Sequence, residues 1–352
     1  MKPGAFARRL VAWQRRHGRH DLPWQNPATP YRVWVSEIML QQTRVATVIP
    51  YFERFVARFP DAAALARASL DEVLALWAGL GYYARARGLH RAARLVVERH
   101  GGELPADPEA LMALPGIGRS TAGAILALAH GLPYPILDGN ARRVLARFHA
   151  VEGWPGEPAV ARRLWALAEA HTPRREVRAY TQAIMDLGAT VCTRTAPRCG
   201  DCPVRAGCAA HASGEPARWP APRPRRALPE RETRMLLVVD GAGRVLLTRR
   251  PPAGVWGGLW CPPEVPEGEA PACWARRALG LRVRGVRELE PVRHSFTHFR
   301  LRIRPLRAEL VPGSASGVME AGGALWYKVR ARPRPGMPAP VARLVERALG
   351  GA

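Results

Sequence analysis

Residues 114–122 read LPGIGRSTA and lie between two stretches of helical periodicity. Gly116 and Gly118 permit a tight turn whose backbone amides stay uncovered, and the helix that follows adds free N–H groups at its first turn. Such a turn binds phosphate without a preference for base sequence. A plain interhelical turn is the simpler alternative, because a lone G-x-G motif is a weak signal. The stretch predicts a helix–turn–helix with an anion site at the turn.

Helical spacing of apolar residues extends on both sides of this turn, from residue 5 to about residue 210. One example is the set Leu70, Val73, Leu74 and Trp77. Proline and glycine separate these stretches, and none shows strand-like alternation. The pattern predicts an all-α domain over residues 1–211. Residues 212–232 are rich in Pro and Arg, which predicts a semi-extended linker.

After the linker the apolar period changes to that of strands. Residues 235–239 and 245–247 flank a glycine-containing turn and predict a β-hairpin. Further strands are expected near residues 281–289, 299–310 and 325–329, and helices near 272–279 and 341–349. Residues 233–352 are therefore predicted to form a smaller α+β domain. The chain is expected to be multidomain.

The chain has 352 residues, with 53 Lys and Arg against 29 Asp and Glu, so its formal net charge is +24. Its 47% hydrophobic content argues against a wholly disordered chain. An excess of positive charge of this size causes self-repulsion within the protein unless a polyanion binds to it. Nucleic acid is the commonest such partner. A membrane surface or simple solubility is the alternative. Since no signal peptide or long apolar stretch is found, a soluble, cytoplasmic protein without a membrane partner is expected.

Four of the six cysteines, Cys192, Cys199, Cys202 and Cys208, fall within one short segment as C-x6-C-x2-C-x5-C. Closely spaced thiolates on a loop can wrap one metal centre, and four-Cys sets hold zinc or an iron–sulfur cluster. Zinc would be favoured by two C-x2-C pairs, and only one is present. Disulfides are disfavoured in an intracellular protein. The segment predicts a metal centre.

Two carboxylates stand out in the helical region. Glu37 lies among aromatic and aliphatic residues in the stretch 33–42, where burial would raise its pKa and suit it to donate a proton. A solvated helical glutamate is the alternative. Asp138 lies in the stretch LDGN at 137–140, which opens another helix. The commonest role of such an aspartate is to cap the helix.

Five ordered motifs taken together carry a family resemblance. They are LPW at 22–24, SEIMLQQT at 36–43, GLGYYAR at 79–85, the turn at 114–122 and ILDGN at 136–140. The chain resembles the helix–hairpin–helix DNA glycosylases, and most closely the MutY-type adenine DNA glycosylases. The resemblance covers essentially the whole chain. It implies a helical glycosylase domain in which the four cysteines (192–208) hold a [4Fe–4S] cluster, followed by a Nudix-like lesion-recognition domain.

The resemblance also implies the reaction. It is hydrolysis of the N-glycosidic bond of adenine mispaired with 8-oxoguanine, or with guanine, in double-stranded DNA by a monomeric base-excision-repair enzyme. Glu37 would protonate the departing purine and assist water, Asp138 would stabilise the oxocarbenium-like sugar, and Asn140 would orient Asp138 or the water. Ser120 takes the place of the lysine nucleophile of endonuclease III-like relatives, which implies a monofunctional enzyme. A bifunctional glycosylase and lyase acting on damaged pyrimidines is the alternative.

The resemblance further implies a set of substrate contacts around an everted base. The implied residues are Trp24, Leu40, Gln42, Tyr82, Ser120, Gln182, Phe296, Thr297 and His298, with Gly116 and Gly118 at the DNA phosphates. Thr297 stands where these enzymes usually carry serine. Arg277 and Ala278 lie where a Nudix hydrolase needs metal-binding glutamates, so lesion recognition is expected of this domain rather than phosphohydrolysis. A non-catalytic DNA-binding module is a further alternative.

Overall fold

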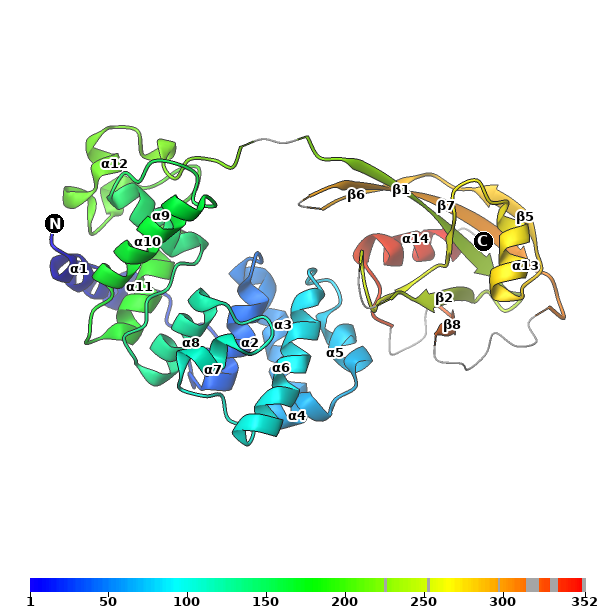
Figure 1. Ribbon diagram of the computed structural model, residues 1–352, viewed down its shortest axis with the longest axis horizontal. Coiled ribbons are helices and arrows are strands. Elements are labelled where there is room, and N and C mark those ends of the chain that lie inside the picture. The colour runs from blue at the N-terminus through cyan, green and yellow to red at the C-terminus, as the bar shows by residue number, and fades with distance from the viewer. Residues whose placement is uncertain (225–226, 252–253, 297, 315–322, 330–334, 350–352) are drawn as a thin grey trace. The chain divides into compact units, whose positions relative to one another are not determined.

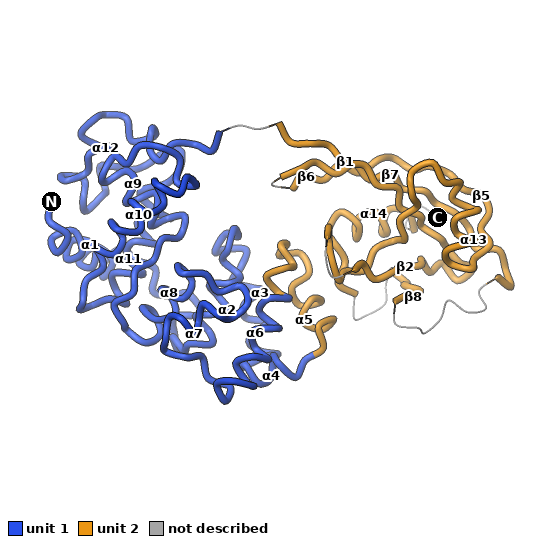
Figure 2. Tube along the Cα trace, viewed as in Figure 1, with its two compact units in different colours: residues 1–68, 87–225 blue, residues 69–86, 226–352 orange. Residues whose placement is uncertain are grey.

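The computed structural model describes residues 1–224, 227–251, 254–296, 298–314, 323–329 and 335–349 (Figure 1). The chain divides into two compact units (Figure 2), the first formed by residues 1–68 and 87–225 and the second by residues 69–86 and 226–352. Residues 1–224 are all described and contain helices but no strand, which confirms the all-α prediction for this part of the chain. None of the described helices is long and apolar enough to cross a membrane.

The helices of residues 1–224 follow one another with short connections. They are α1 (Pro3–His17), α2 (Pro30–Leu40), α3 (Val45–Arg58), α4 (Ala62–Arg67), α5 (Leu70–Trp77), α6 (Ala84–His100), α7 (Pro108–Met112), α8 (Arg119–His130), α9 (Gly139–Phe148), α10 (Pro158–His171), α11 (Val177–Thr190), η1 (Cys199–Asp201), η2 (Arg205–Gly207), α12 (Ala209–Ala212) and η3 (Pro216–Arg218). Several of these helices have a side-chain cap at the N-terminus. Asp61, Ser69 and Asp107 accept hydrogen bonds from backbone amides in the first turns of α4, α5 and α7.

An aromatic cluster joins α1, α9 and α10. The Phe6 ring lies 4.7 Å from Phe148 and 4.4 Å from His171, measured between centroids, and both contacts are edge-to-face. His171 is 2% exposed, and its Nε2 lies 2.8 Å from Nε2 of His149. Burial, the charge of His149 and the N-terminal amine lower the pKa of His171 from 6.5 to about 4.

This lowered pKa predicts acid sensitivity. As the pH falls from 6.5 towards about 4, the unfolded chain takes up a proton that folded His171 resists, so stability present above pH 6.5 is progressively lost. The loss amounts to about 3 kcal/mol when complete. His171→Phe should flatten this dependence, as followed by urea unfolding at about pH 7.5 and about pH 5. His17→Gln, at an exposed histidine, should leave it unchanged. An equally steep acid loss in His171→Phe would contradict the assignment.

The second unit contains a mixed sheet of eight described strands in the order β3-β2-β1-β7-β5, with β4 on β1, β6 on β7 and β8 on β2. The strands are β1 (Glu230–Val239), β2 (Val245–Arg249), β3 (Trp260–Cys261), β4 (Glu264–Val265), β5 (Val283–Glu288), β6 (Val292–Ser295), β7 (Arg300–Leu310) and β8 (Ala324–Tyr327). The helices are α13 (Pro271–Leu279) and α14 (Ala339–Leu349). The long strands β1 and β7 run parallel, from Glu230 opposite Arg300 to Val239 opposite Glu309.

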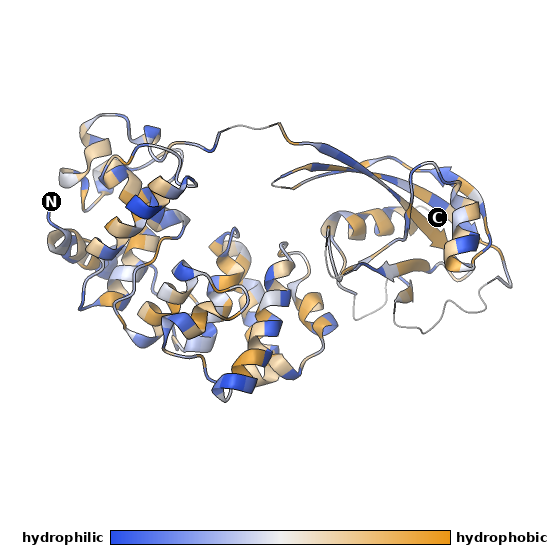
Figure 3. Cartoon of the chain, in the orientation of Figure 1, coloured by the Kyte–Doolittle hydropathy of each residue, from blue (hydrophilic) through white to orange (hydrophobic). Residues whose placement is uncertain are grey.

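Both faces of this sheet are covered, which explains the unbroken apolar run at the end of β1. Met235 and Leu237 face the core that includes Val341 and Leu344 of α14, while Leu236 and Val238 face the core that includes Ala275 of α13. Figure 3 shows the change along β1 from hydrophilic residues at its start to hydrophobic residues at its end.

The predicted hairpin is confirmed, since β1 and β2 pair antiparallel with Val239 opposite Val245. The predicted strands and helices of this region are also found, within a few residues of their expected bounds. The short strands β3, β4 and β6 were not predicted. Strand β1 starts at Glu230, within the stretch read as linker, because its exposed first residues pair with β7.

Candidate active site

The glycine turn joins α7 to α8 as predicted. Gly116 adopts a left-handed φ of 86°, which favours glycine. Gly118 caps α8 without a side-chain hydrogen bond, so the first amides of that helix stay uncovered. Its φ of −94° is ordinary, and a Cβ there would meet no atom within 4 Å. The fold of the protein therefore does not itself require glycine at 118, whereas close approach of a ligand to the backbone would.

Ser120 connects this helix to the segment that carries Asp138. Its Oγ accepts a hydrogen bond of 3.0 Å from the backbone amide of Leu137. Asp138 is the N-cap of α9, and its carboxylate accepts from the amides of Asn140 (3.1 Å) and Ala141 (2.8 Å). Asp138 therefore does cap α9, as its position in the sequence suggested, and these hydrogen bonds hold its carboxylate at the start of the helix.

Glu37 lies on α2, which packs against α8. Burial raises the pKa of Glu37 from 4.5 to about 8, and the charge of Asp138 adds to the effect. The structure therefore brings the two predicted carboxylates close enough to interact electrostatically. At neutral pH Glu37 holds a proton that it can donate, so the solvated-glutamate alternative does not apply.

A chain of hydrogen bonds leads from Asp138 to the cysteine segment. Asn140 Nδ2 donates to Asp138 Oδ2 (3.1 Å), and Asn140 Oδ1 accepts from Arg143 Nη2 (2.9 Å). Arg143 also donates to the carbonyls of Gly188 (2.6 Å) and Cys192 (2.7 Å). A Cβ on Gly188 would lie 2.5 Å from that of Asn140, so glycine permits this close approach of α11 to α9. Arg143 was not predicted from the sequence, because its role depends on the approach of α11 to α9.

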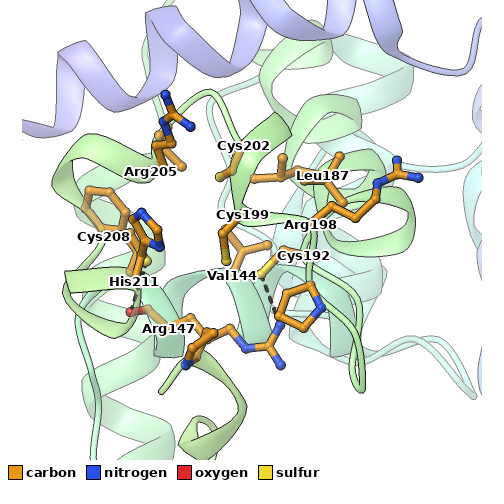
Figure 4. Close-up of a pocket in the computed structure, with 15 residues that line it drawn as sticks. Val144, Arg147, Leu187, Cys192, Arg198, Cys199, Cys202, Arg205, Cys208 and His211 are labelled. Carbon is orange, nitrogen blue, oxygen red and sulfur yellow. Dashed lines mark hydrogen bonds between the residues drawn. The ribbon is translucent and has the colours of Figure 1, made fainter. Parts of the chain in front are cut away.

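The four clustered cysteines line one pocket (Figure 4). Arg147 of α9 is 2% exposed and holds this segment. Its guanidinium donates to the carbonyls of Thr193 (2.6 Å), Arg194 (3.0 Å) and Trp219 (2.9 Å), and to Sγ of Cys192 (3.4 Å). Among the described residues, no three Cys, His, Asp or Glu side chains form a site for a single metal ion.

A separate cavity of about 450 Å³ has both Trp24 and Gln182 in its wall. The volume is typical of a small-ligand pocket. Val33 of α2 and Leu128 of α8 add apolar wall. The ring of Trp24 is fixed by an edge-to-face contact with Phe52, at 5.4 Å between centroids. The wall of this cavity thus contains two of the residues expected around the base, but neither Glu37 nor Asp138.

Two of the residues expected to wedge into DNA have left-handed backbones. Gln42, two residues beyond Leu40 at the end of α2, has a φ of 60°, and Tyr82 has a φ of 49°. Non-glycine residues rarely adopt this conformation, and such strain gathers at functional sites. Tyr82 is also 48% exposed, which is unusual for so large an aromatic residue, and the Arg85 guanidinium lies 5.3 Å from its ring.

In the second unit, an aromatic cluster surrounds Phe296. Its ring stacks on Phe299 at 4.5 Å and lies 4.6 Å from His294, 5.7 Å from Trp256 and 6.3 Å from His298. Thr297 lies outside the described residues. Trp256, whose φ of 55° is again left-handed, was not predicted from the sequence. No local pattern connects it to Phe296, since the contact forms across 40 residues of chain.

Comparison with known proteins decides the family. The chain is 34% identical to the adenine DNA glycosylase of Buchnera aphidicola subsp. Acyrthosiphon pisum over 97% of both chains. The chain belongs to the adenine DNA glycosylase family. Another relative in this family, the human adenine DNA glycosylase, is 37% identical over 84% of this chain and 65% of its own. The resemblance drawn from the five motifs is confirmed, and the endonuclease III-like alternative is not favoured.

Two family models match separate parts of the chain. Residues 35–170 match the HhH-GPD superfamily base excision DNA repair protein model, and residues 234–347 match a NUDIX domain. A thermostable thymine-DNA glycosylase superposes with a TM-score of 0.53 at 25% identity, over 60% of this chain and 97% of its own. An endonuclease III in a non-covalent DNA complex shares the fold, with a TM-score of 0.52 at 20% identity, over 61% of this chain and 98% of its own. The predicted fold class is confirmed.

The hydrogen bonds of Arg143 that join α9 to α11 and the cysteine segment are expected to stabilise the folded protein. Arg143→Gln should lower the free energy of unfolding by about 2 kcal/mol, because charge-assisted hydrogen bonds to the carbonyls of Gly188 and Cys192 are lost. Urea denaturation measures the change. Arg162→Gln is the matched control, since Arg162 is exposed and makes no hydrogen bond or ion pair within the described residues, and it should be neutral. Equal stability of the two variants would show that the link contributes nothing.

Proposed function

We propose that this protein excises adenine mispaired with 8-oxoguanine, or with guanine, in duplex DNA and so initiates base excision repair. It acts as a monomeric, monofunctional hydrolase in the bacterial cytoplasm. The observation that carries the proposal is the burial of Glu37 near Asp138: burial first, and the charge of Asp138 second, raise the pKa of Glu37 to about 8, while Asp138 itself is held by backbone hydrogen bonds. Two carboxyl groups held in different environments are the machinery of glycoside hydrolysis. Membership of the adenine DNA glycosylase family supports adenine as the base that is released.

In this mechanism Glu37 delivers its proton to the purine, so adenine departs as a neutral leaving group. The sugar then carries oxocarbenium-like positive charge, which the Asp138 carboxylate stabilises. Asn140 holds Asp138 through the 3.1 Å hydrogen bond and so acts as an orienting residue. The deprotonated Glu37 can next take a proton from the attacking water. Ser120 offers no amine, and its hydroxyl is occupied by the Leu137 amide, so no Schiff base forms there.

DNA binding is supported by charge and by the hairpin. A net charge of +24 favours a polyanion, and the uncovered amides at Gly116 and Gly118 suit a phosphate. Trp24 and Gln182, which line one cavity, would contact the everted adenine. Leu40, Gln42 and Tyr82 would fill the space that the base leaves in the stack. The exposure and backbone strain of Tyr82 support this role.

The aromatic cluster supports lesion recognition by the Nudix-like domain. Phe296 and His298, with Thr297 between them, would contact 8-oxoguanine on the strand opposite the adenine. Helix α13 carries Arg277 where a Nudix hydrolase needs a metal-binding glutamate. Recognition is therefore the better reading for this domain than phosphohydrolysis.

The cysteine pocket fits a [4Fe–4S] cluster held by Cys192, Cys199, Cys202 and Cys208. A zinc ion needs four sulfurs about 2.3 Å from one point, whereas a cluster carries its ligands on separate irons and tolerates wider spacing. Four thiols lining one pocket match the ligand set of such a cluster. The bound cluster would make the loop that carries Arg194, Arg198 and Arg205 more rigid. The purified protein should contain about four irons per chain, and zinc alone in active protein would contradict this.

A glycosylase assay on duplexes that pair A, C, G or T with 8-oxoguanine, followed by alkali, tests the proposed function. We expect strand breaks after alkali only in the A-containing duplex, and at the adenine. Borohydride should trap no covalent protein–DNA adduct, which separates the reaction from the lyase alternative. Release of a damaged pyrimidine, or no base release at all despite DNA binding, would contradict the proposal.

A further inference from the structure

An ion pair between the partly exposed Arg19 and the buried Asp186 contacts Gln182. Asp186 is fully buried on α11, and its Oδ1 lies 2.6 Å from Arg19 Nη2. The same carboxylate accepts from Nε of Arg19 (2.7 Å) and from the Arg19 backbone amide (2.9 Å). One turn earlier on α11, Nε2 of Gln182 donates to Asp186 Oδ1 at 2.8 Å. Asp186 thus ties the segment after α1 to the wall of the cavity.

This arrangement settles which way the Gln182 carboxamide faces. A carboxylate opposite a guanidinium has no proton to donate, so only the amide nitrogen of Gln182 can face it. The carboxamide oxygen is therefore turned away from Asp186, and within the described part of the chain it accepts no hydrogen bond. Since Gln182 lines the 450 Å³ cavity, its Oε1 is available there as an acceptor.

We propose that Asp186, paired with Arg19, is a positioning residue that holds Gln182 as an acceptor and so selects purines with a 6-amino group over 6-oxo purines. The inference rests on the proposed function, because it concerns the base that enters this cavity. Adenine can donate its 6-amino hydrogen to Oε1 of Gln182. Hypoxanthine and guanine present an oxygen at that position, so two acceptors would face each other and neither would be satisfied. Asp186 itself contacts no base.

Single-turnover release of adenine and of hypoxanthine, each paired with 8-oxoguanine, tests the inference. Asp186→Asn keeps the shape, but asparagine can offer either an oxygen or an NH₂ group to Gln182, so the carboxamide is free to turn. The ratio of adenine to hypoxanthine rates should fall roughly tenfold. The double variant Asp186→Asn with Gln182→Glu should restore the preference, because a glutamate at 182 can again present an oxygen to the base. Asp61→Asn, at the cap of α4, is the matched control and should keep the wild-type ratio.

A wild-type ratio in folded Asp186→Asn would overturn the inference, as would failure of the double variant to restore the preference. If circular dichroism shows that Asp186→Asn does not fold, Gln182→Leu replaces it. Leucine has no acceptor, so the preference should again be lost, and an unchanged ratio would overturn the proposal. Failure of the proposed function would look different, since the wild-type protein would then release no adenine.

Discussion

Glu37→Gln is expected to slow adenine release by about 10²–10⁴-fold, the usual contribution of a positioned proton donor. Glutamine keeps the shape of the side chain but has no transferable acid proton. Single-turnover assays on duplexes containing A opposite 8-oxoguanine measure the rate. Binding of the same duplex should persist, because the hairpin amides and the cationic surface are unchanged. Turnover near the wild-type rate would remove Glu37 from the mechanism.

The same residue sets the pH dependence. Because its pKa is raised to about 8, Glu37 carries its proton below that pH and loses it above. Adenine release should therefore be level near neutral pH and fall about tenfold per pH unit above about 8. Glu37→Gln should lack this falling limb in its residual rate. If the rate of adenine release by Glu37→Gln still fell above about pH 8, a group other than Glu37 would be responsible for the pH dependence.

Asp138→Asn is expected to lower the rate by about 10²–10³-fold, because the anion that stabilises the developing sugar cation is lost. Asparagine retains an oxygen that can cap α9, so the free energy of unfolding should hardly change. Asp138→Ala removes the cap as well and should cost about 1 kcal/mol of stability besides the activity. Urea denaturation beside single-turnover rates separates the two effects. Equal activity of Asp138→Asn and wild-type protein would exclude the electrostatic role.

The electrostatic interaction between Glu37 and Asp138 predicts a change in the pH–rate profile of Asp138→Asn. The charge of Asp138 helps to raise the pKa of Glu37, so its removal should lower that pKa. The falling limb of the pH–rate profile should move to lower pH in Asp138→Asn. A limb that stays at about pH 8 would show that burial alone sets the pKa of Glu37.

Local sequence predicted the features that depend on local physics. The helical repeat gave the all-α region, the glycine turn gave the hairpin at Gly116 and Gly118, and the apolar stretches around residue 240 gave the β1–β2 hairpin. Glu37 and Asp138 could be named because each lies in a recognisable motif. Their proximity could not be derived from spacing, since about 100 residues separate them, and it came from the family resemblance.

The features that were missed all depend on contacts between distant segments. Strand β7 lies beside β1 in parallel, a pairing that no turn signals. Arg143 gains its role only because α11 approaches α9 at Gly188, and Trp256 only because the fold brings it to Phe296. In a sequence with 53 Lys and Arg, a single arginine carries no mark of burial or partnership.

The Arg147 side chain has a practical consequence for dividing the chain into fragments. Its buried guanidinium needs the carbonyl of Trp219, and the indole of Trp219 is itself 5% exposed and donates to Glu152 at 3.2 Å. An expression fragment that stopped at residue 211 would strip one acceptor from a desolvated cation and uncover an apolar surface. A catalytic fragment intended for crystallisation or NMR should therefore extend to about residue 225, the last residue of the first compact unit.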